Sequence, residues 1–317
     1  WPADFNCPAP LDIQLDRLAL SLPEKKEVEE VNSNTASALW PAMKINIDSL
    51  SVDGIDLGKL ELVANRDTQT WTIDSASLMA DSFHAEVKSA VWQQRPAREK
   101  SKFSVQMNST DLSALLENFG YQQAIEADNI NIILDLESPT HPFAITKSTI
   151  AGNLNINVGK GKLNDIEPGA AGRIFGLMSV AALPRRLSLD FSDLFSAGFS
   201  FDSIKGDFKF TNGLAITDNL TLNGAPAKIE MAGPIDLVNK QYDQRVKVTP
   251  NVSSTLPLAG AVAGGPIGLG IGTALLVVDK ITGKLFGKNI VNLISYSYHL
   301  SGPWDDPQLS VIKPVTQ

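Results

Sequence analysis

The chain has 317 residues and a mass of 34.1 kDa, with 43% hydrophobic and 20% charged residues, enough to bury a sizeable core in one to three domains. Its 27 basic and 35 acidic residues give a formal net charge of −8. Such an acidic balance lacks the basic footprint of general DNA and RNA binders, so we expect no nucleic acid partner. The single cysteine, Cys7, excludes a disulfide within these residues and a zinc site built from several thiolates.

The N-terminal part carries few structural signals. The sequence begins at Trp1 without an initiator methionine, a basic stretch or an apolar leader, so we expect a fragment whose preceding residues carried the targeting information. Residues 24–35 are charged and polar with little apolar content, which predicts a mobile loop. A functional acidic segment is the alternative.

From Met43 to Phe210, apolar and polar residues alternate in short runs separated by turn residues. A period of two places the apolar side chains on one face of a strand and the polar ones on the other. Turn signals between such runs are typical of an antiparallel meander. The runs are 44–48, 59–62, 70–74, 102–107, 129–132, 152–158 and 207–210, and the turn signals are 53–54, 65–67, 159–161 and 212–213.

Helical patterns are sparse and occur at 110–119, at 165–183 and after residue 256. A one-sided sheet with little helix to cover its apolar face must hide that face by curling or with a ligand. We therefore predict a mostly β protein: a long curved antiparallel sheet forming an open apolar groove, with a few helices capping the C-terminal end. A sandwich or barrel with a filled core is the alternative, because it shows the same alternation.

The second predicted helix, at 165–187, is apolar nearly all round. It could plug the end of the sheet, or it could be a membrane-seeking or gating helix with arginines near lipid phosphates. The residues that we assign to this end cap or membrane contact are Arg173, Ile174, Phe175, Leu177, Met178, Arg185 and Arg186.

Residues 248–278 contain no charged side chain, but prolines and glycines interrupt them. The longest proline-free piece, 267–278, would be ~18 Å long as a helix, too short for a bilayer core of ~30 Å. We predict a re-entrant or interfacial hairpin with lysines suited to anionic headgroups, and a buried glycine-rich helical pair is the alternative. The residues assigned to this contact are Leu269, Ile271, Leu275, Leu276, Lys280 and Lys284.

No pattern of catalytic or metal-binding residues stands out. Paired carboxylates such as Asp190 and Asp193 could serve a carbohydrate-active enzyme, but a solvated strand face explains them better. His84, His141 and His299 lie far apart and lack metal-ligand spacing. We predict that the protein is not an enzyme and that it uses neither a metal nor a cofactor.

Several motifs resemble one known family. They are Leu-Pro-Arg-Arg-Leu (183–187), Asp-Phe-Ser-Asp (190–193), Met-Ala-Gly-Pro-Ile-Asp-Leu (231–237) and Gly-Pro-Trp-Asp-Asp-Pro (302–307). Together they resemble the C-terminal region of the AsmA-like family of Gram-negative envelope proteins, and the resemblance covers most of the chain.

The resemblance implies a piece of a longer periplasmic protein, anchored in the inner membrane by an N-terminal helix that precedes these residues. Members of the family resemble repeating β-grooves along which phospholipid moves towards the outer membrane. The resemblance therefore implies non-enzymatic glycerophospholipid transport, with this part proximal to the outer membrane and in contact with it. An envelope scaffold or adhesin with a filled β core and no lipid cargo is the alternative.

The apolar residues of the alternating pattern in the predicted strands are the candidate lipid-groove residues. The predicted organisation is 1–164 groove repeats, 165–187 apolar helix, 188–250 continued groove, 251–290 glycine-rich apolar segment and 291–317 final strand and tail. The candidates are Ile45, Ile47, Leu60, Leu62, Trp71, Ile73, Phe103, Val105, Met107, Ile130, Ile132, Leu134, Leu154, Ile156, Val158, Phe208 and Phe210.

Overall fold

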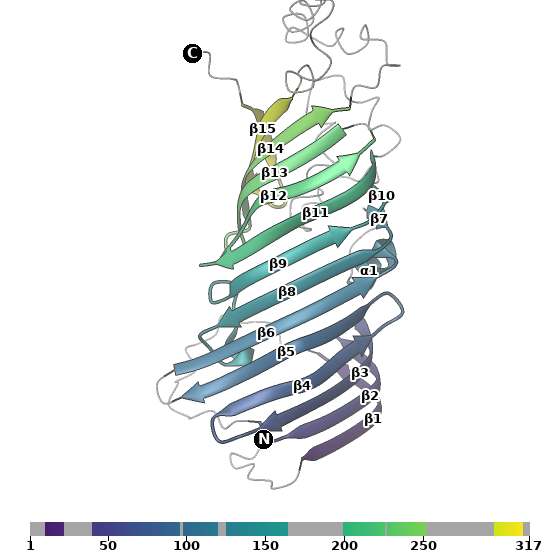
Figure 1. Ribbon diagram of the computed structural model, residues 1–317, viewed down its shortest axis with the longest axis vertical. Helices are drawn as coiled ribbons and strands as arrows, with labels where there is room; N and C mark the ends of the chain where they lie inside the picture. Colours follow the sequence, from purple (N-terminus) through teal and green to yellow (C-terminus); the bar gives the residue numbers. More distant parts are fainter. Residues whose placement is uncertain are drawn as a thin grey trace, which may run out of the picture. The chain divides into compact units, whose positions relative to one another are not determined.

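The computed structural model describes residues 10–21, 40–95, 98–119, 125–163, 199–225, 227–251 and 295–312. In these residues, sixteen strands form one mixed, mostly antiparallel open sheet, accompanied by one short α-helix and a 3-10 turn (Figure 1). The mostly β, mostly antiparallel fold predicted from the sequence is confirmed. The sheet is not antiparallel throughout, because β1 and β2 pair in parallel. The capping helices predicted at 165–187 and within 251–290 lie outside the described residues.

The sheet follows chain order with one side branch. Its order is β1-β2-β3-β4-β5-β6-β8-β9-β11-β12-β13-β14-β15-β16, and β10 pairs with both β11 and β7. The elements are β1 (Leu11–Leu20), β2 (Met43–Val52), β3 (Ile55–Arg66), β4 (Thr70–Met79), β5 (His84–Arg95), β6 (Arg98–Ser109), α1 (Leu112–Asn118), β7 (Ile125–Ala127), β8 (Ile130–Ser138), η1 (Pro142–Ala144), β9 (Ala151–Val158), β10 (Gly161–Leu163), β11 (Phe199–Thr211), β12 (Leu214–Gly224), β13 (Ala227–Asp236), β14 (Gln241–Pro250), β15 (Tyr296–Pro303) and β16 (Gln308–Val311).

The chain divides into two compact units. Unit 1 comprises Trp1–Tyr121, Asn129–Ile156 and Phe208–Gly213, and unit 2 comprises Gln122–Asp128, Asn157–Asp207 and Leu214–Gln317.

The turns form where residues that tolerate positive φ or cap a turn are placed. Asp53 and Gly54, between β2 and β3, have φ of 51° and 81°, the signature of a two-residue hairpin turn. After β3, the Asp67 carboxylate accepts hydrogen bonds from the backbone N–H groups of Gln69 and Thr70 at 2.8 and 2.7 Å. The turn predicted at 65–67 is therefore displaced, because residues 65 and 66 are the last two of β3.

The helix predicted at 110–119 is confirmed as α1. Its N-cap, Asp111, accepts a hydrogen bond from the backbone N–H of Ala114 at 3.0 Å, which satisfies one of the free donors at a helix start. At the other end, the Asn118 side chain donates to the Asp56 carbonyl oxygen at 2.5 Å and accepts from the Asp56 N–H at 3.2 Å. These bonds tie α1 to the beginning of β3.

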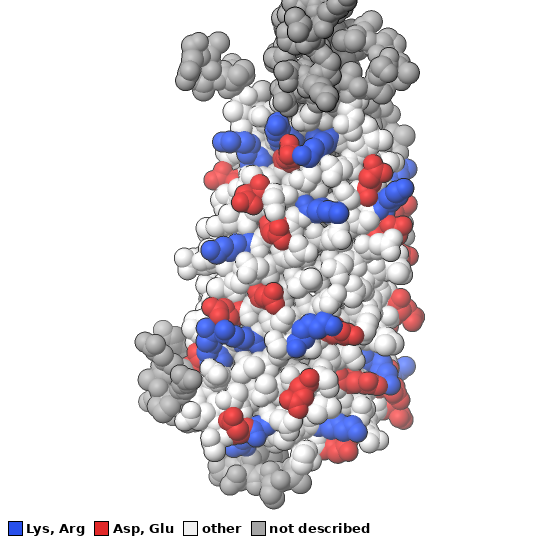
Figure 2. Space-filling model, viewed as in Figure 1, with Lys and Arg blue, Asp and Glu red and all other residues white. Residues whose placement is uncertain are grey.

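The polar face of the unit 1 strands carries charges of both signs in short-range pairs. Lys100 donates to Glu137 at 3.0 Å across β6 and β8, and this bond lowers the pKa of Glu137. Lys59 and Glu61 pair within β3 at 2.7 Å. Figure 2 shows acidic and basic side chains interspersed over the viewed face of the molecule. Exposed pairs of this kind contribute little stability, so they mark this as a solvated face.

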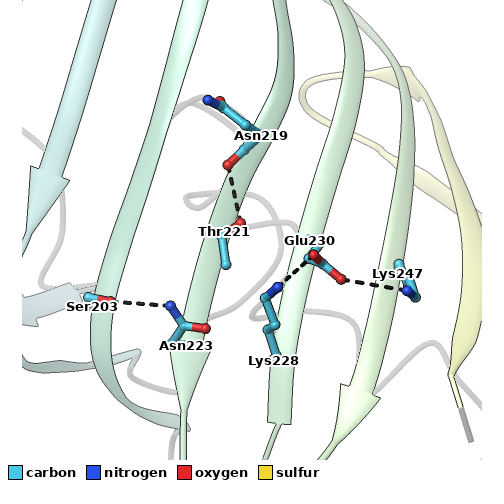
Figure 3. Close-up of polar contacts among 7 residues, drawn as sticks. All are labelled: Ser203, Asn219, Thr221, Asn223, Lys228, Glu230 and Lys247. Atoms are coloured by element: carbon cyan, nitrogen blue, oxygen red, sulfur yellow. Dashed lines mark hydrogen bonds and ion pairs between the residues drawn. The ribbon is translucent and has the colours of Figure 1, made fainter. Parts of the chain in front are cut away.

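In unit 2, the two faces of the strands differ sharply in exposure. Ile229 on β13 and Val246 on β14 are 1% and 0% exposed. On the opposite face, Glu230 accepts from Lys228 at 2.7 Å and lies 3.8 Å from the Lys247 Nζ (Figure 3). The apolar face of unit 2 is therefore a closed core.

Two side chains of this closed core have polar groups without a hydrogen-bond partner. Gln244 on β14 and Tyr298 on β15 are each 1% exposed, and neither the Gln244 amide nor the Tyr298 hydroxyl has a hydrogen-bond partner. Burial raises the pKa of Tyr298 to about 12. Leaving such a group unsatisfied costs about 1–3 kcal/mol, so this is a weak point in an otherwise well-packed interior.

Candidate functional site

Strand register in unit 1 aligns apolar side chains across seven strands, β1 to β6 and β8. Residues directly opposite each other on neighbouring strands share a face of the sheet. A rung is a row of residues that lie opposite one another on successive strands. Three consecutive rungs contain apolar residues alone, and we call these 21 residues the apolar face. Its rows are Leu15-Ile47-Leu60-Leu78-Ala85-Met107-Ile132, Ile13-Ile45-Leu62-Ala76-Val87-Val105-Leu134 and Leu11-Met43-Ala64-Ile73-Ala90-Phe103-Leu136.

The rows stay aligned although the register shifts at several places. Between β5 and β6, Val87 pairs with Val105 and Ser89 with Ser104, which leaves Lys88 as an extra residue on β5. An extra residue at a bulge changes the alternation locally and lets the following residues regain the same face. The bulge is therefore part of what keeps the apolar face continuous.

The apolar face is neither closed nor fully exposed. Seventeen of its 21 residues are half-buried, and Leu15 on the edge strand β1 is 39% exposed. The three buried members are Ile47, Ala64 and Ala90. Seven strands at ~4.8 Å spacing extend the rows over roughly 29 Å. A contiguous apolar surface of this size that still meets solvent is typical of a binding face.

Aromatic rings border the apolar face at one end of the strands. Trp71 and Trp92 face each other across β4 and β5 on the next rung. The Trp40 ring lies 4.9 Å from Trp71 and 5.5 Å from Trp92, and the His141 ring lies 4.3 Å from Trp92. Burial lowers the pKa of His141, opposed by the nearby charge of Glu99. We call Trp40, Trp71, Trp92 and His141 the tryptophan margin.

Apolar groups and α1 border the other end of the same strands. Leu112 and Leu115 of α1 are buried, and so is Phe83, which precedes β5. The Phe83 and Phe119 rings are 6.1 Å apart. We call Phe83, Leu112, Leu115 and Phe119 the helix margin. The apolar face is therefore bordered by a margin of tryptophan and histidine rings and by a margin of leucine and phenylalanine side chains.

The structure brings most of the predicted groove residues together. Ten of them belong to the apolar face: Ile45, Ile47, Leu60, Leu62, Ile73, Phe103, Val105, Met107, Ile132 and Leu134. Trp71 lies in the tryptophan margin, and Ile130 lies one rung beyond the apolar face, opposite Ser109. Leu154, Ile156 and Val158 lie on β9, and Phe208 and Phe210 on β11 are buried. Their part in lipid binding stays a prediction.

Sequence reasoning missed β1 and β5 and the neighbours that they contribute. On β5, Ala85, Val87 and Ala90 belong to the apolar face, but the extra residue at Lys88 breaks the alternation, and alanine is a weak hydrophobic signal. On β1, the alternation over Leu11–Leu15 was available in the sequence. The predicted membrane-contact residues within 173–186 and 269–284, and the acidic pair Asp190 and Asp193, lie outside the described residues.

The described part of the chain contains neither a membrane-spanning helix nor a cluster of metal ligands. Its helices are all too short or too polar to cross a membrane. Nowhere within the described ranges do three His, Cys, Asp or Glu side chains lie close enough together to hold a metal ion.

Comparison with known proteins places the chain in a family. No solved structure matches it. A curated relative, "Intermembrane phospholipid transporter YhdP" of Escherichia coli (strain K12), is 30% identical over 275 residues, which is 86% of this chain and 21% of the relative. The chain thus spans about a fifth of that relative's length, and the relative is named as a transporter and not as an enzyme. The profile of the family described as YhdP protein matches residues 1–309, and this chain therefore belongs to the YhdP family.

Proposed function

We propose that this chain is one section of a non-enzymatic conduit that carries glycerophospholipid along the apolar face of unit 1. The observation that carries the proposal is the set of three unbroken apolar rows, most of whose members are half-buried. The E. coli relative, which is named as an intermembrane phospholipid transporter, supplies the cargo class. Hydrophobic contact is sufficient for this task, because a conduit has no bond to make or break.

The energetics favour a surface of this kind. A phospholipid with two acyl chains has about thirty methylenes, and exposing them to water at ~0.8 kcal/mol each costs roughly 25 kcal/mol, an upper estimate. An apolar face that stays in contact with the acyl chains removes most of this free-energy cost. Because the contact is non-directional, a lipid can move along the rows from one strand to the next without breaking specific polar bonds.

We place this section in the cell envelope of a Gram-negative bacterium, in the periplasmic part of an inner-membrane-anchored protein. The motifs that resemble the C-terminal region of the AsmA-like family support a position near the outer membrane. In this proposal, residues 165–187 and 256–290 make the end cap or the membrane contact. Protein partners at that membrane are left unnamed.

A scaffold or adhesin with a filled core is the rival function. The closed core of unit 2 is what such a protein needs, and Val246 with 0% exposure is its clearest member. The half-buried rows of unit 1 do not suit a scaffold, because a load-bearing sheet gains nothing from leaving an apolar face in contact with water.

Adjacent isoleucines on opposite faces of β8 allow a matched test. Ile132 lies in the apolar face, opposite Met107, whereas Ile133 is 38% exposed on the other face, opposite Gln106. We expect Ile132→Asp to remove most of the phospholipid that co-purifies with the chain, because an ionised carboxylate would have to lie against acyl chains. Ile133→Asp should leave the lipid in place. Native mass spectrometry with lipid extraction measures both.

Three results of this experiment are informative. Lipid lost in Ile132→Asp and kept in Ile133→Asp supports the conduit, provided that both variants show wild-type circular dichroism. Equal lipid in both folded variants excludes this face as the lipid-binding surface. A lipid-free wild-type chain that also takes up no phospholipid from vesicles favours the scaffold.

A further inference from the structure

We infer that phospholipids lie on the apolar face with their acyl chains along the strands and their headgroups at the tryptophan margin. The inference rests on the proposed function and deepens it, because it assigns a headgroup site and a direction to each lipid. It follows from the way in which polarity changes along the strands, from the helix margin to the tryptophan margin.

Polarity rises in steps towards the tryptophan margin. On β5, the residues that share a face run from Val87 through Ala90 to Trp92 and then to Gln94. On β6 opposite, Phe103 is followed by Ser101 and then by Glu99, which pairs with Gln94. The order is aliphatic, then aromatic or hydroxyl, then amide and carboxylate. A membrane surface has the same order of groups. Here Trp71 and Trp92 are buried, at 5% and 1% exposure, and the groups at this end that reach solvent are Gln94 and Glu99.

Polarity does not rise towards the helix margin. Leu112, Leu115 and Phe83 close that end as buried apolar groups. The Ser109 hydroxyl at this end of β6 donates to the Ser82 carbonyl oxygen at 2.6 Å, as the Ser101 hydroxyl at the other end donates to Thr140. The two hydroxyls therefore do not distinguish the ends, and the difference in polarity rests on Gln94 and Glu99. A headgroup placed here would be next to leucine and phenylalanine side chains, which suit the end of an acyl chain better than a polar group.

The width of the apolar face suits one acyl chain laid along the strands. Residues i and i+2 of a strand are ~6.7 Å apart, so three rungs span roughly 13 Å. One leaflet of a bilayer core, which contains one acyl chain length, is about 15 Å thick, half of ~30 Å. A lipid turned by a right angle would lie across the ~29 Å rows and place its headgroup among aliphatic residues.

The tryptophan margin holds groups that suit a glycerophosphate. Arg66 lies on the same rung as Trp71, directly opposite it across β3 and β4, and is exposed. A guanidinium is the preferred partner of a phosphate among side chains. The loop that carries His141 is held over this end by Ser101 and Ser138, which bond to the Thr140 carbonyl oxygen and hydroxyl at 2.7 and 2.8 Å. The ligand recognised here is a phosphate group attached to an apolar tail.

Site-specific photocrosslinking in the full 317-residue chain tests the orientation. Benzoylphenylalanine replaces Gln94 beside the tryptophan margin, Phe119 in the helix margin, or Ile133 on the polar face as the control. Each variant is incubated with vesicles containing equal amounts of phosphatidylethanolamine and phosphatidylglycerol and then irradiated. Fragmentation of the adducts by mass spectrometry shows which part of the lipid was captured.

We expect most adducts at position 94 on the glycerol or headgroup and most adducts at position 119 on the acyl chains, with few at position 133. The same mixture at positions 94 and 119, or the reverse assignment, would overturn the orientation while leaving the conduit intact. Absence of adducts at 94 and 119, together with full lipid retention by Ile132→Asp, would overturn both proposals. Arg66→Gln should reduce the share of phosphatidylglycerol among the adducts at position 94, and an unchanged share would remove Arg66 from the headgroup site.

Discussion

Val105 in unit 1 and Val246 in unit 2 occupy equivalent positions in their strands, yet their surroundings differ. Each is an apolar residue between polar neighbours, and each faces an apolar residue on the adjacent strand. Val105 is half-buried, whereas Val246 is 0% exposed. The alternating pattern specifies which face of a sheet is apolar, but it does not specify whether that face is covered. In this chain, one pattern occurs both in a half-buried apolar face and in a closed core.

The largest expected effect is the contrast between Val246→Asp and Val105→Asp. A carboxylate at position 246 has no route to water, so we expect a loss of at least ~4 kcal/mol of stability and unfolding of the β13–β15 region. At position 105 the carboxylate can reach solvent, and a loss of about 1–2 kcal/mol is expected. Hydrogen exchange resolved by peptide distinguishes the two units. Equal loss of protection in both variants would mean that the apolar face of unit 1 is as closed as that of unit 2.

A smaller effect of opposite sign is expected from Gln244→Leu. The substitution removes an unsatisfied amide from the core of unit 2, so stability should rise by about 1–2 kcal/mol. Gln241→Leu, on the same strand at an exposed position, should change stability by less than about 0.5 kcal/mol. Thermal or urea denaturation measures both. A loss of stability in Gln244→Leu would show that the amide has a partner, such as a buried water molecule.

The smallest expected effect concerns the pH dependence of unit 1. Burial lowers the pKa of His141 in the folded chain, while the unfolded chain keeps a histidine pKa of about 6.5. The unfolded state therefore binds more protons just below this value. The contribution of His141 to stability is present above pH ~6.5 and is lost as the pH falls through the lowered pKa.

The control for this effect is His141→Phe, which keeps a ring beside Trp92 but cannot titrate. Its Tm should fall less than the wild-type Tm between pH 7 and pH 5, as followed by tryptophan fluorescence. Identical slopes in the two proteins would mean that His141 is not desolvated in the tryptophan margin.

Much of the strand layout could be predicted from local sequence. The turns at Asp53-Gly54 and Asn212-Gly213 were predicted and take the positive φ that such pairs favour. The turn near residue 66 was misplaced because Asn and Asp both favour turns, and the Asp67 carboxylate supplies the turn bonds. The parallel pairing of β1 with β2 could not be predicted, because alternation describes a strand's faces and carries no information on its direction relative to a neighbour.

The sequence predicted individual groove residues, but not how they are arranged on the sheet. Isoleucines such as Ile45 and Ile47 were found because they stand between polar residues. The small residues between them, such as Ala85, were missed because a small side chain contributes little to an alternation signal. The tryptophan margin depends on contacts between residues far apart in sequence, such as Trp40 with Trp92, and neither propensity nor period encodes those.

The register that aligns the three rows makes strand length a constraint on the proposed transport. Deleting one residue from the middle of β6 would exchange its two faces beyond the deletion. Lys102, Ser104 and Gln106 would then replace part of the series Phe103, Val105 and Met107 in the rows. The rows on one side of the deletion would then contain a polar residue of β6, which interrupts the apolar path in those rows while leaving the sheet hydrogen-bonded. A change of strand length in unit 1 is therefore tolerable in the turns, and within a strand only where a bulge, as at Lys88, returns the following residues to the same face.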